Sequence, residues 1–238
     1  MEPRRPGAGR ALHRRGAGGE GGLIAWAAVD PVTGAVEHEN GSSVFAAAST
    51  IKLFVYSAFR RSKLEPNEAR PVARVGGSGV TEYLQTPLPL ADHAFLMLAV
   101  SDNASTNVLL ERLGFDAVAE EIGRLGLRDT RVRRAMMSDG PENESTPLDL
   151  AKGLARLLEE VFAADMLDAL RVAADAESFL PHLLPDVVVA AKSGQLDTVR
   201  HEVAFLERGE RRLVTAVCSS PPARPDELAA VAAQRWAA

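Results

Sequence analysis

The order of strand-like and helical segments in this chain predicts an α+β fold, arranged as an α/β/α sandwich. Two short apolar runs of strand character stand near the N-terminus and three near the C-terminus, and the stretch between them has almost entirely helical spacing. The two early strands must pair with the three late ones to bury their apolar residues. We therefore expect a five-stranded antiparallel sheet flanked by helices, with an all-helical subdomain inserted between its two halves.

The predicted strands are bounded by turn-forming residues. The first strand, residues 22–30, ends in the turn sequence Asp-Pro-Val-Thr-Gly, after which residues 35–39 return as its hairpin partner. A Glu-Arg-Gly-Glu turn separates the last two strands. The three strands predicted near the C-terminus are residues 186–191, 199–206 and 212–218.

The predicted helices are recognised by apolar residues three and four positions apart. One begins at Ser49 and runs to Arg61, and a last one, residues 226–236, follows the proline-rich break at 221–225. Those predicted in the middle of the chain are residues 90–100, 105–112, 115–125 and 147–161.

The chain length of 238 residues suits one catalytic unit made of two closely packed subdomains. We expect residues 21–60 and 182–238 to form the α/β subdomain and residues 61–181 the helical one. Residues 1–20 are rich in arginine and glycine and lack an apolar run, which predicts a disordered tail rather than a secretory signal. The chain as encoded is then cytoplasmic, and an extracytoplasmic location would require a different start.

Composition limits the partners to small molecules. A net charge of -5 argues against a general nucleic-acid binder, because phosphate neutralisation needs a positive face. No run approaches the roughly 18 apolar residues that span a bilayer, and the single cysteine, Cys218, excludes an intramolecular disulfide and the usual thiolate metal sites. We expect a monomer without metal or cofactor and without nucleic-acid or membrane partners.

Ser49 and Lys52 stand three positions apart at the start of a predicted helix. Positions three apart share one face, so the lysine amine lies over the serine hydroxyl. The free backbone N–H groups and the dipole at a helix start favour negative charge developing nearby. Alone, the pair is more typical of a helix cap followed by a solvated lysine.

Two further polar motifs fall at predicted element boundaries. The first is Ser101-Asp102-Asn103, between two helices, where a hydroxyl and an amide are free to face a cleft, although these residues also suit a helix-capping turn. The second motif ends the strand-like run 187–191. It consists of Lys192, Ser193 and Gly194, and its glycine leaves room for a ligand along the strand edge, although an ordinary turn would look the same.

Taken together, the three motifs resemble those of the penicillin-recognising active-site serine enzymes, specifically the class A β-lactamase-related branch. They occur in the family's order and in the expected settings of helix start, inter-helix loop and strand edge. The resemblance runs from about Leu23 to the C-terminus. Residues 77–80, 143–150 and 199–201 also look like that branch.

The resemblance implies a β-lactam or acyl-D-amino-acid substrate that acylates Ser49. Lys52 would act as base or proton relay, which needs its pKa to fall roughly three units from about 10.4, and burial and the second cation Lys192 both act in that direction. Ser101 would pass the proton to the leaving nitrogen. The residues implied to hold the substrate are Asn103 for its amide, Lys192 and Ser193 beside Gly194 for its carboxylate, Gln195 for the second oxyanion N–H, and Arg200 or His201 for a further cation.

The loop before Thr146 and Pro147 departs from the branch. A class A β-lactamase carries there a glutamate that activates the water clearing the acyl-enzyme, and residues 131–143 lack its Glu-x-x-Leu-Asn signature. Water activation contributes typically about 10² to 10⁴-fold, so we expect slow deacylation. The nearby carboxylates that are candidates to replace it belong to Asp139, Glu142 and Glu144.

The leading interpretation is a serine hydrolase of the β-lactamase type, with penicillin binding, β-lactam breakdown and antibiotic resistance as its associated roles. A D-Ala-D-Ala peptidase or esterase and a non-turnover penicillin or muropeptide sensor stay open, because both fit slow deacylation. A Ser-His-Asp hydrolase is disfavoured by the lack of a Gly-x-Ser-x-Gly elbow, and a zinc enzyme by the lack of His-x-His or His-Glu-x-x-His spacing. Retention of every polar residue in the three motifs disfavours an inactive scaffold.

Overall fold

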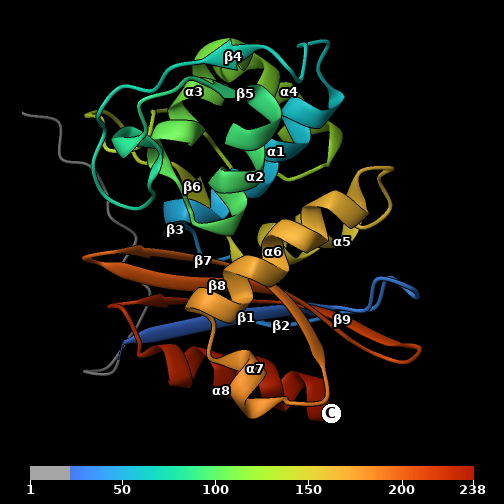
Figure 1. Ribbon diagram of the computed structural model, residues 1–238. Helices are drawn as coiled ribbons and strands as arrows, with labels where there is room; N and C mark the ends of the chain where they lie inside the picture. The colour runs from blue at the N-terminus through green and yellow to red at the C-terminus, as the bar shows by residue number, and fades with distance from the viewer. Residues whose placement is uncertain (1–21) are drawn as a thin grey trace, which may run out of the picture.

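A five-stranded antiparallel sheet separates two helical layers in the computed structural model, which describes residues 22–238 (Figure 1). The predicted tail, residues 1–20, lies outside the described residues. In spatial order β2-β1-β9-β8-β7, the sheet joins the chain's two ends, which confirms the predicted α+β class. Its strands are β1 (Leu23–Val29), β2 (Val36–Glu39), β7 (Val188–Leu196), β8 (Val199–Arg208) and β9 (Arg211–Ser220).

Alternation of side chains along β1 shows how the sheet serves both layers. Ala25 and Ala27 belong to the core cluster shared with the larger helical layer. Ile24 and Trp26, one position away, pack against the cluster under the C-terminal helix. Successive residues of a strand point to opposite faces. Because β1 lies between two helical layers, both of its faces are covered, and its residues are apolar on both.

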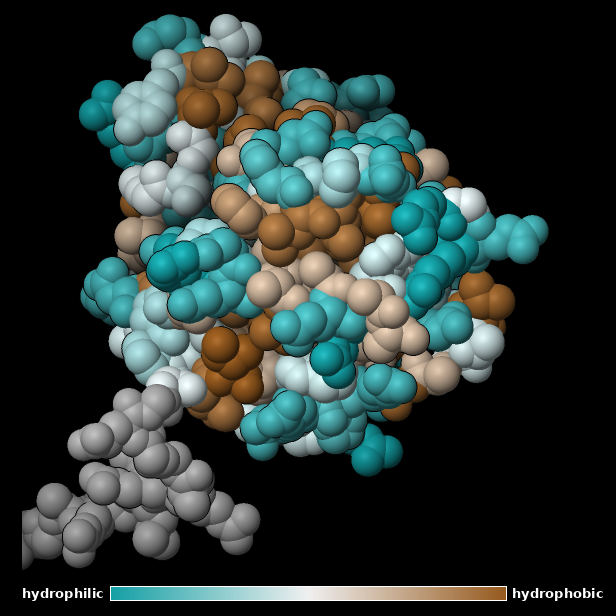
Figure 2. Space-filling model, turned by 90° about the horizontal axis from the view of Figure 1, so that it is seen from below, coloured by the Kyte–Doolittle hydropathy of each residue, from teal (hydrophilic) through white to brown (hydrophobic). Residues whose placement is uncertain are grey.

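One face of the sheet is covered by α8 (Pro225–Ala237) and the short α7 (Leu180–Leu183). Leu228, Ala232 and Trp236 of α8 are buried against the strands. Seen from that side, apolar residues reach the surface in patches between polar ones (Figure 2).

The other face carries the larger helical layer. Helix α5 lies on β1 and β9, and α1, almost wholly buried, packs against α2, α3 and α4. The helices of this layer are α1 (Lys52–Arg61), α2 (Leu90–Ala99), α3 (Asn103–Leu113), α4 (Phe115–Arg124), α5 (Pro147–Leu157) and α6 (Ala163–Glu177). No helix within residues 22–238 is both long and apolar enough to cross a membrane.

Short elements link these layers near the site. The 3-10 turn η1 (Ala48–Ile51) precedes α1, and β3 (Phe45–Ala46) pairs with β6 (Glu144–Ser145). On the far side of the helical layer, β4 (Ala69–Arg70) pairs with β5 (Leu88–Pro89), and η2 (Thr81–Tyr83) lies between them in the chain.

Several element boundaries differ from the sequence prediction. The helix predicted over 147–161 ends at Leu157, because the chain turns to bury Phe162 against the ring of Tyr56. The strand predicted over 186–191 continues to Leu196, because all of it pairs with β8. Helix α6 was not predicted, although its buried residues Met166, Ala169, Leu170 and Ala173 have helical spacing.

Candidate active site

Ser49 lies in η1, where the chain comes unusually close to β7. The backbone enters this turn through Ala48, whose φ of 49° is in the left-handed region, and Ala47 N donates to Asn143 O at 2.7 Å. A Cβ on Gly194 of β7 would stand 3.0 Å from Ser49 N and 3.1 Å from Ala48 Cβ. Glycine is therefore required at this position so that the strand edge can lie beside the serine.

Lys52 is fully buried one turn after Ser49, and its amine has three hydrogen-bond partners. Lys52 Nζ donates to Ser101 O at 2.6 Å, to Asn103 Oδ1 at 2.9 Å and to Ser101 Oγ at 3.1 Å. Burial, followed by the neighbouring charge of Lys192, holds the pKa of Lys52 well below its ordinary value. We call Lys52, Ser101 and Asn103 the helical wall of the cleft.

The Ser-Asp-Asn loop acts both as a helix cap and as part of the cleft. Asp102 is the N-cap of α3 and accepts a 2.8 Å hydrogen bond from Ser105 N, as the capping interpretation requires. Ser101, at a φ of 54°, turns its side chain the other way. The strained backbone at Ser101 therefore lets one loop cap a helix and present a hydroxyl to Lys52.

Residues 76–79 wrap around this loop and hold it in place. Asn103 N donates to Ser78 O at 2.9 Å, and Asn103 Nδ2 donates to Gly76 O at 3.1 Å. Gly77 has a φ of 75°, and a Cβ there would stand 2.5 Å from Asn103 Nδ2. The glycines are needed because the two loops approach each other this closely.

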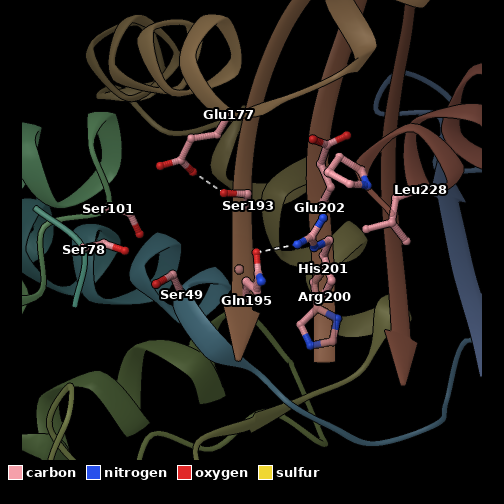
Figure 3. Close-up of a pocket in the computed structure, with 12 residues that line it drawn as sticks. Ser49, Ser78, Ser101, Glu177, Ser193, Gln195, Arg200, His201, Glu202 and Leu228 are labelled. Atoms are coloured by element: carbon pink, nitrogen blue, oxygen red, sulfur yellow. Dashed lines mark hydrogen bonds between the residues drawn. The ribbon is translucent and has the colours of Figure 1, made fainter. Parts of the chain in front are cut away.

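Lys192 and Ser193, neighbours on β7, point to opposite faces of the sheet. Lys192 is fully buried, its Nζ donates to Ser193 O at 2.9 Å, and it lies 3.9 Å from Glu177 Oε2 at the end of α6. Burial lowers the pKa of Lys192 to about 8, although the Glu177 carboxylate opposes this shift. Ser193 Oγ donates to the same Glu177 carboxylate (Figure 3).

Gln195 and Arg200 lie directly opposite each other on β7 and β8. Arg200 Nη2 donates to Gln195 Oε1 at 2.7 Å (Figure 3). His201 points to the other face, where its Nε2 lies 2.8 Å from Ala46 O. Because side chains alternate along β8, Arg200 shares a face with Ser193 and His201 does not. The His201 ring instead contacts the backbone just before η1.

Two adjoining clefts meet at Ser49. The first, of about 330 Å³, is lined on its helical side by Ser49, Ser78 and Ser101 and on its sheet side by Ser193 and Gln195 (Figure 3). The second, of about 440 Å³, extends from Ser49 past Asn103. Its outer lining includes Arg134, Met136, Met137, Glu142 and Asn143. Ser49 is therefore open to a ligand from two sides.

Two carboxylates in the first cleft were missed by the sequence analysis. Glu177 ends α6, an unfavourable place for a negative charge next to the helix C-terminus, and this mismatch was the available signal. Glu202 lies opposite Ser193 on β8 and is 8% exposed, and its Oε1 has no hydrogen-bond partner in the described part of the chain. Burial raises the pKa of Glu202 to about 7, although a hydrogen bond with Ser178 opposes this shift, and Glu177 adds to it. We call Ser193, Glu177 and Glu202 the sheet wall.

Of the three carboxylates predicted as substitutes for the missing glutamate, Asp139 and Glu142 lie in the loop beside the second cleft and Glu144 begins β6. Glu142 lines this cleft but forms an ion pair of 2.8 Å with Arg134, and Glu144 forms one of 2.8 Å with Arg133. Asp139 is exposed and does not line either cleft. Within the described residues, the loop thus presents no unpaired carboxylate to Ser49, and no cluster of metal-ligating side chains occurs.

The family comparison agrees with this architecture. A model of the Beta-lactamase enzyme family matches residues 11–236. Among solved structures, the beta-lactamase from Sphaerobacter thermophilus DSM 20745 is 30% identical, with a TM-score of 0.76 over 84% of this chain and 83% of that one. The class A beta-lactamase from Mycobacterium abscessus is 22% identical, with a TM-score of 0.78 over 92% and 95%.

A third similar structure is that of PBP-A, which is 23% identical, with a TM-score of 0.74 over 88% of this chain and 86% of that one. No curated protein matches the sequence. The two matches below 25% identity speak for the fold, whereas the family model covers nearly the whole chain. The chain therefore belongs to the beta-lactamase enzyme family, whose members are serine hydrolases.

Proposed function

We propose that this protein is an acyl-transfer hydrolase in which Ser49 forms an acyl-enzyme with an amide or ester substrate, the class that includes β-lactams. The observation that carries the proposal is the buried amine of Lys52, one helical turn from Ser49 and hydrogen-bonded to Ser101 Oγ at 3.1 Å. Burial and the neighbouring charge of Lys192 hold the pKa of Lys52 well below its ordinary value, which favours the neutral amine that can accept a proton.

Acylation needs one proton to move from nucleophile to leaving group. Lys52 takes the proton from Ser49 Oγ as that oxygen bonds to the substrate carbonyl carbon. The oxyanion is stabilised by backbone N–H groups of Ser49 and Gln195, which lie on either side of the close contact at Gly194. Ser101, within hydrogen-bond distance of Lys52, then delivers the proton to the leaving nitrogen or oxygen as its bond to the carbonyl carbon breaks.

Removal of the acyl group is the slow step of the proposed cycle. At the loop that carries the water-activating glutamate in class A β-lactamases, Glu142 and Glu144 are ion-paired here, and Asp139 lines neither cleft. An acyl-enzyme complex with penicillin G has been solved for a variant of PBP-A, one of the similar structures. A long-lived adduct favours a peptidase-like enzyme or a sensor, and a short-lived one favours an esterase or lactamase.

Intact-mass spectrometry of the full chain tests this function. The protein is incubated separately with penicillin G and with 4-nitrophenyl phenylacetate, alongside Ser49→Ala. We expect a one-to-one adduct with at least one probe, mapped to the peptide that contains Ser49, and no adduct in S49A. An adduct that persists in S49A would overturn the proposal, and so would the absence of an adduct with both probes. The rate of adduct loss separates the alternatives.

A further inference from the structure

A buried histidine interrupts the apolar face of α2. His93 has no exposed surface and stands among buried residues such as Leu90 and Ala94. Burying a polar ring is costly unless both of its nitrogens find partners. Both do here, because Nδ1 lies 2.9 Å from Ser105 Oγ and Nε2 lies 3.1 Å from Arg70 O. The ring therefore links α2 to α3 on one side and to β4 on the other.

The contact with Arg70 fixes the direction of the hydrogen bond to α3. A carbonyl oxygen only accepts, so His93 Nε2 carries the proton that it donates to Arg70 O. With the proton on Nε2, Nδ1 of a neutral ring is an acceptor, and the Ser105 hydroxyl donates to it. Ser105 Oγ also lies 3.3 Å from Thr81 Oγ1. The Ser105 side chain is therefore held in one orientation by His93.

Ser105 and Thr81 also hold the carboxylate of Asp102. Asp102 Oδ1 accepts hydrogen bonds from Ser105 N at 2.8 Å and from Thr81 Oγ1 at 2.6 Å. Asp102 Oδ2 accepts from the backbone N–H groups of Thr81 at 2.8 Å and Val80 at 2.6 Å. Burial acts to raise the pKa of Asp102, but these hydrogen bonds outweigh it and hold the pKa below its ordinary value. The middle residue of the Ser-Asp-Asn loop is therefore tied to the residues that contact His93.

The two neighbours of Asp102 in this loop are acceptors of the Lys52 amine. Ser101 Oγ accepts at 3.1 Å and Asn103 Oδ1 at 2.9 Å. Ser101 has a φ of 54°, which residues other than glycine rarely adopt, so tertiary contacts must hold the loop in this conformation. A shift of Ser105 would release part of that hold and move both acceptors relative to Lys52.

We infer that His93 is a positioning residue for the Ser-Asp-Asn loop and acts through Ser105. This inference rests on the proposed function, because the loop provides the path of the proton from Lys52 to the leaving group. His93 lines neither cleft at Ser49 but a separate cavity of about 170 Å³ beside β4 and η2. Loss of its bond to Ser105 slows proton transfer more than it weakens substrate binding, because small displacements of reacting groups are costly.

Two amide substitutions separate the two hydrogen bonds of the ring. An asparagine amide reaches the place of Nδ1 and a glutamine amide that of Nε2, so His93→Asn keeps the bond to Ser105 and His93→Gln keeps the bond to Arg70. Stopped-flow acylation by 4-nitrophenyl phenylacetate gives the acylation rate constant and the dissociation constant separately. We expect H93Q to lower the rate constant at least about tenfold and to change the dissociation constant less than about threefold. H93N should stay within about threefold of the native protein in both.

Ser105→Ala removes the same hydrogen bond from its other end and keeps the backbone N–H that Asp102 accepts. S105A should slow acylation as H93Q does, and the double variant H93Q/S105A should be no slower than either, because one interaction is lost in all three. Ser57→Ala, which removes another fully buried serine hydroxyl that is bonded to Glu121, is the matched control and should leave acylation unchanged. Equal slowing by H93N and H93Q would indicate a role in stability alone and would overturn the inference.

Amide hydrogen exchange separates failure of this inference from failure of the proposed function, because it needs no substrate. Exchange is followed by mass spectrometry on peptides that cover residues 76–83 and 101–106. We expect H93Q and S105A to speed exchange of both peptides about fivefold, the size of one lost hydrogen bond, while H93N and the peptide of α8 stay as in the native protein. This result supports the inference even if no acyl-enzyme forms. Unchanged exchange in H93Q overturns it.

Discussion

The helical wall and the sheet wall of the cleft differ in how their polar groups are paired. On the helical wall, the single buried amine of Lys52 is matched by three acceptors within 3.1 Å. On the sheet wall, Ser193 Oγ donates to Glu177, and the buried Glu202 Oε1 has no partner within residues 22–238. A satisfied network resists rearrangement, whereas an unsatisfied one favours a ligand that completes it. The contrast fits the proposed placement of proton transfer on the helical wall.

Removing the amine of the helical wall is expected to have the largest effect. Lys52→Met keeps a long apolar stem and should lower the rate constant of acylation about 10² to 10⁴-fold, because the proton acceptor is lost. The buried oxygens of Ser101 and Asn103 also lose a donor, at a cost of about 1–3 kcal/mol in stability. Stopped-flow acylation and urea unfolding measure the two effects, with the exposed Lys63→Met as control. Native-like acylation in K52M would remove Lys52 from the proton path.

On the sheet wall, Glu202→Gln should raise stability in a pH-dependent manner. Burial raises the pKa of Glu202 to about 7, so the folded protein keeps a proton that the unfolded chain loses near pH 4.3. The stability that this proton contributes is full below about pH 4.3 and is lost as the pH rises through 7. We expect E202Q to gain up to about 3 kcal/mol over the native protein at pH 8.5, and little at pH 4.5.

Urea unfolding at the two pH values provides the measurement for E202Q. Glu210→Gln, in the exposed turn between β8 and β9, is the matched control and should change stability equally at both. If the gain of E202Q is the same at both pH values, the carboxyl group does not titrate as its burial requires. The charge of the sheet wall would then not change with pH in the range that the burial of Glu202 implies.

The contact between the two walls can be disturbed through Gly194. A Cβ there would stand 3.0 Å from Ser49 N and 3.2 Å from Thr50 Cγ2, so Gly194→Ala should push η1 away from β7. We expect acylation to slow about tenfold, because small displacements of a reacting group are costly. Gly123→Ala is the control, since its Cβ would meet nothing within 4 Å. Unchanged acylation in G194A would mean that the close approach is not needed for reaction.

The smallest effect is expected from Glu142, which borders the second cleft. Its carboxylate is ion-paired with Arg134 at 2.8 Å, so Glu142→Gln should change the lifetime of the acyl-enzyme less than about twofold. Intact-mass spectrometry over time measures this, with the exposed Glu111→Gln as baseline. A slowing of tenfold or more would instead identify Glu142 as the group that activates water, consistent with the usual size of general-base effects.

Much of the helical wall was predictable because its signals are local. Ser49 and Lys52 share a helical face by spacing alone, and Ser101 and Asn103 belong to a contiguous motif. The capping role of Asp102, proposed as the simple alternative, also holds in the structure, so the two interpretations of that motif were compatible. What spacing did not indicate is that Lys52 reaches both polar neighbours of Asp102.

The sheet wall was less predictable because its members come from separate elements. The strand predicted to stop at residue 191 runs on to Leu196, since pairing with β8 outweighs the turn character of Ser193 and Gly194. That pairing brings Glu202 opposite Ser193, and the register left open between Arg200 and His201 is settled by the same alternation. No local pattern marks any of these pairings.

From its amino-acid order alone, the chain determined the α+β class, the five-stranded sheet and the three motifs around Ser49, because periodicity and short motifs are properties of neighbouring residues. Only the tertiary structure decided which carboxyl groups lie in the same cleft as Ser193. The approach of Glu177 depends on where α6 ends against β7, and that of Glu202 on strand register. Both are set by long-range packing, which residue spacing does not encode.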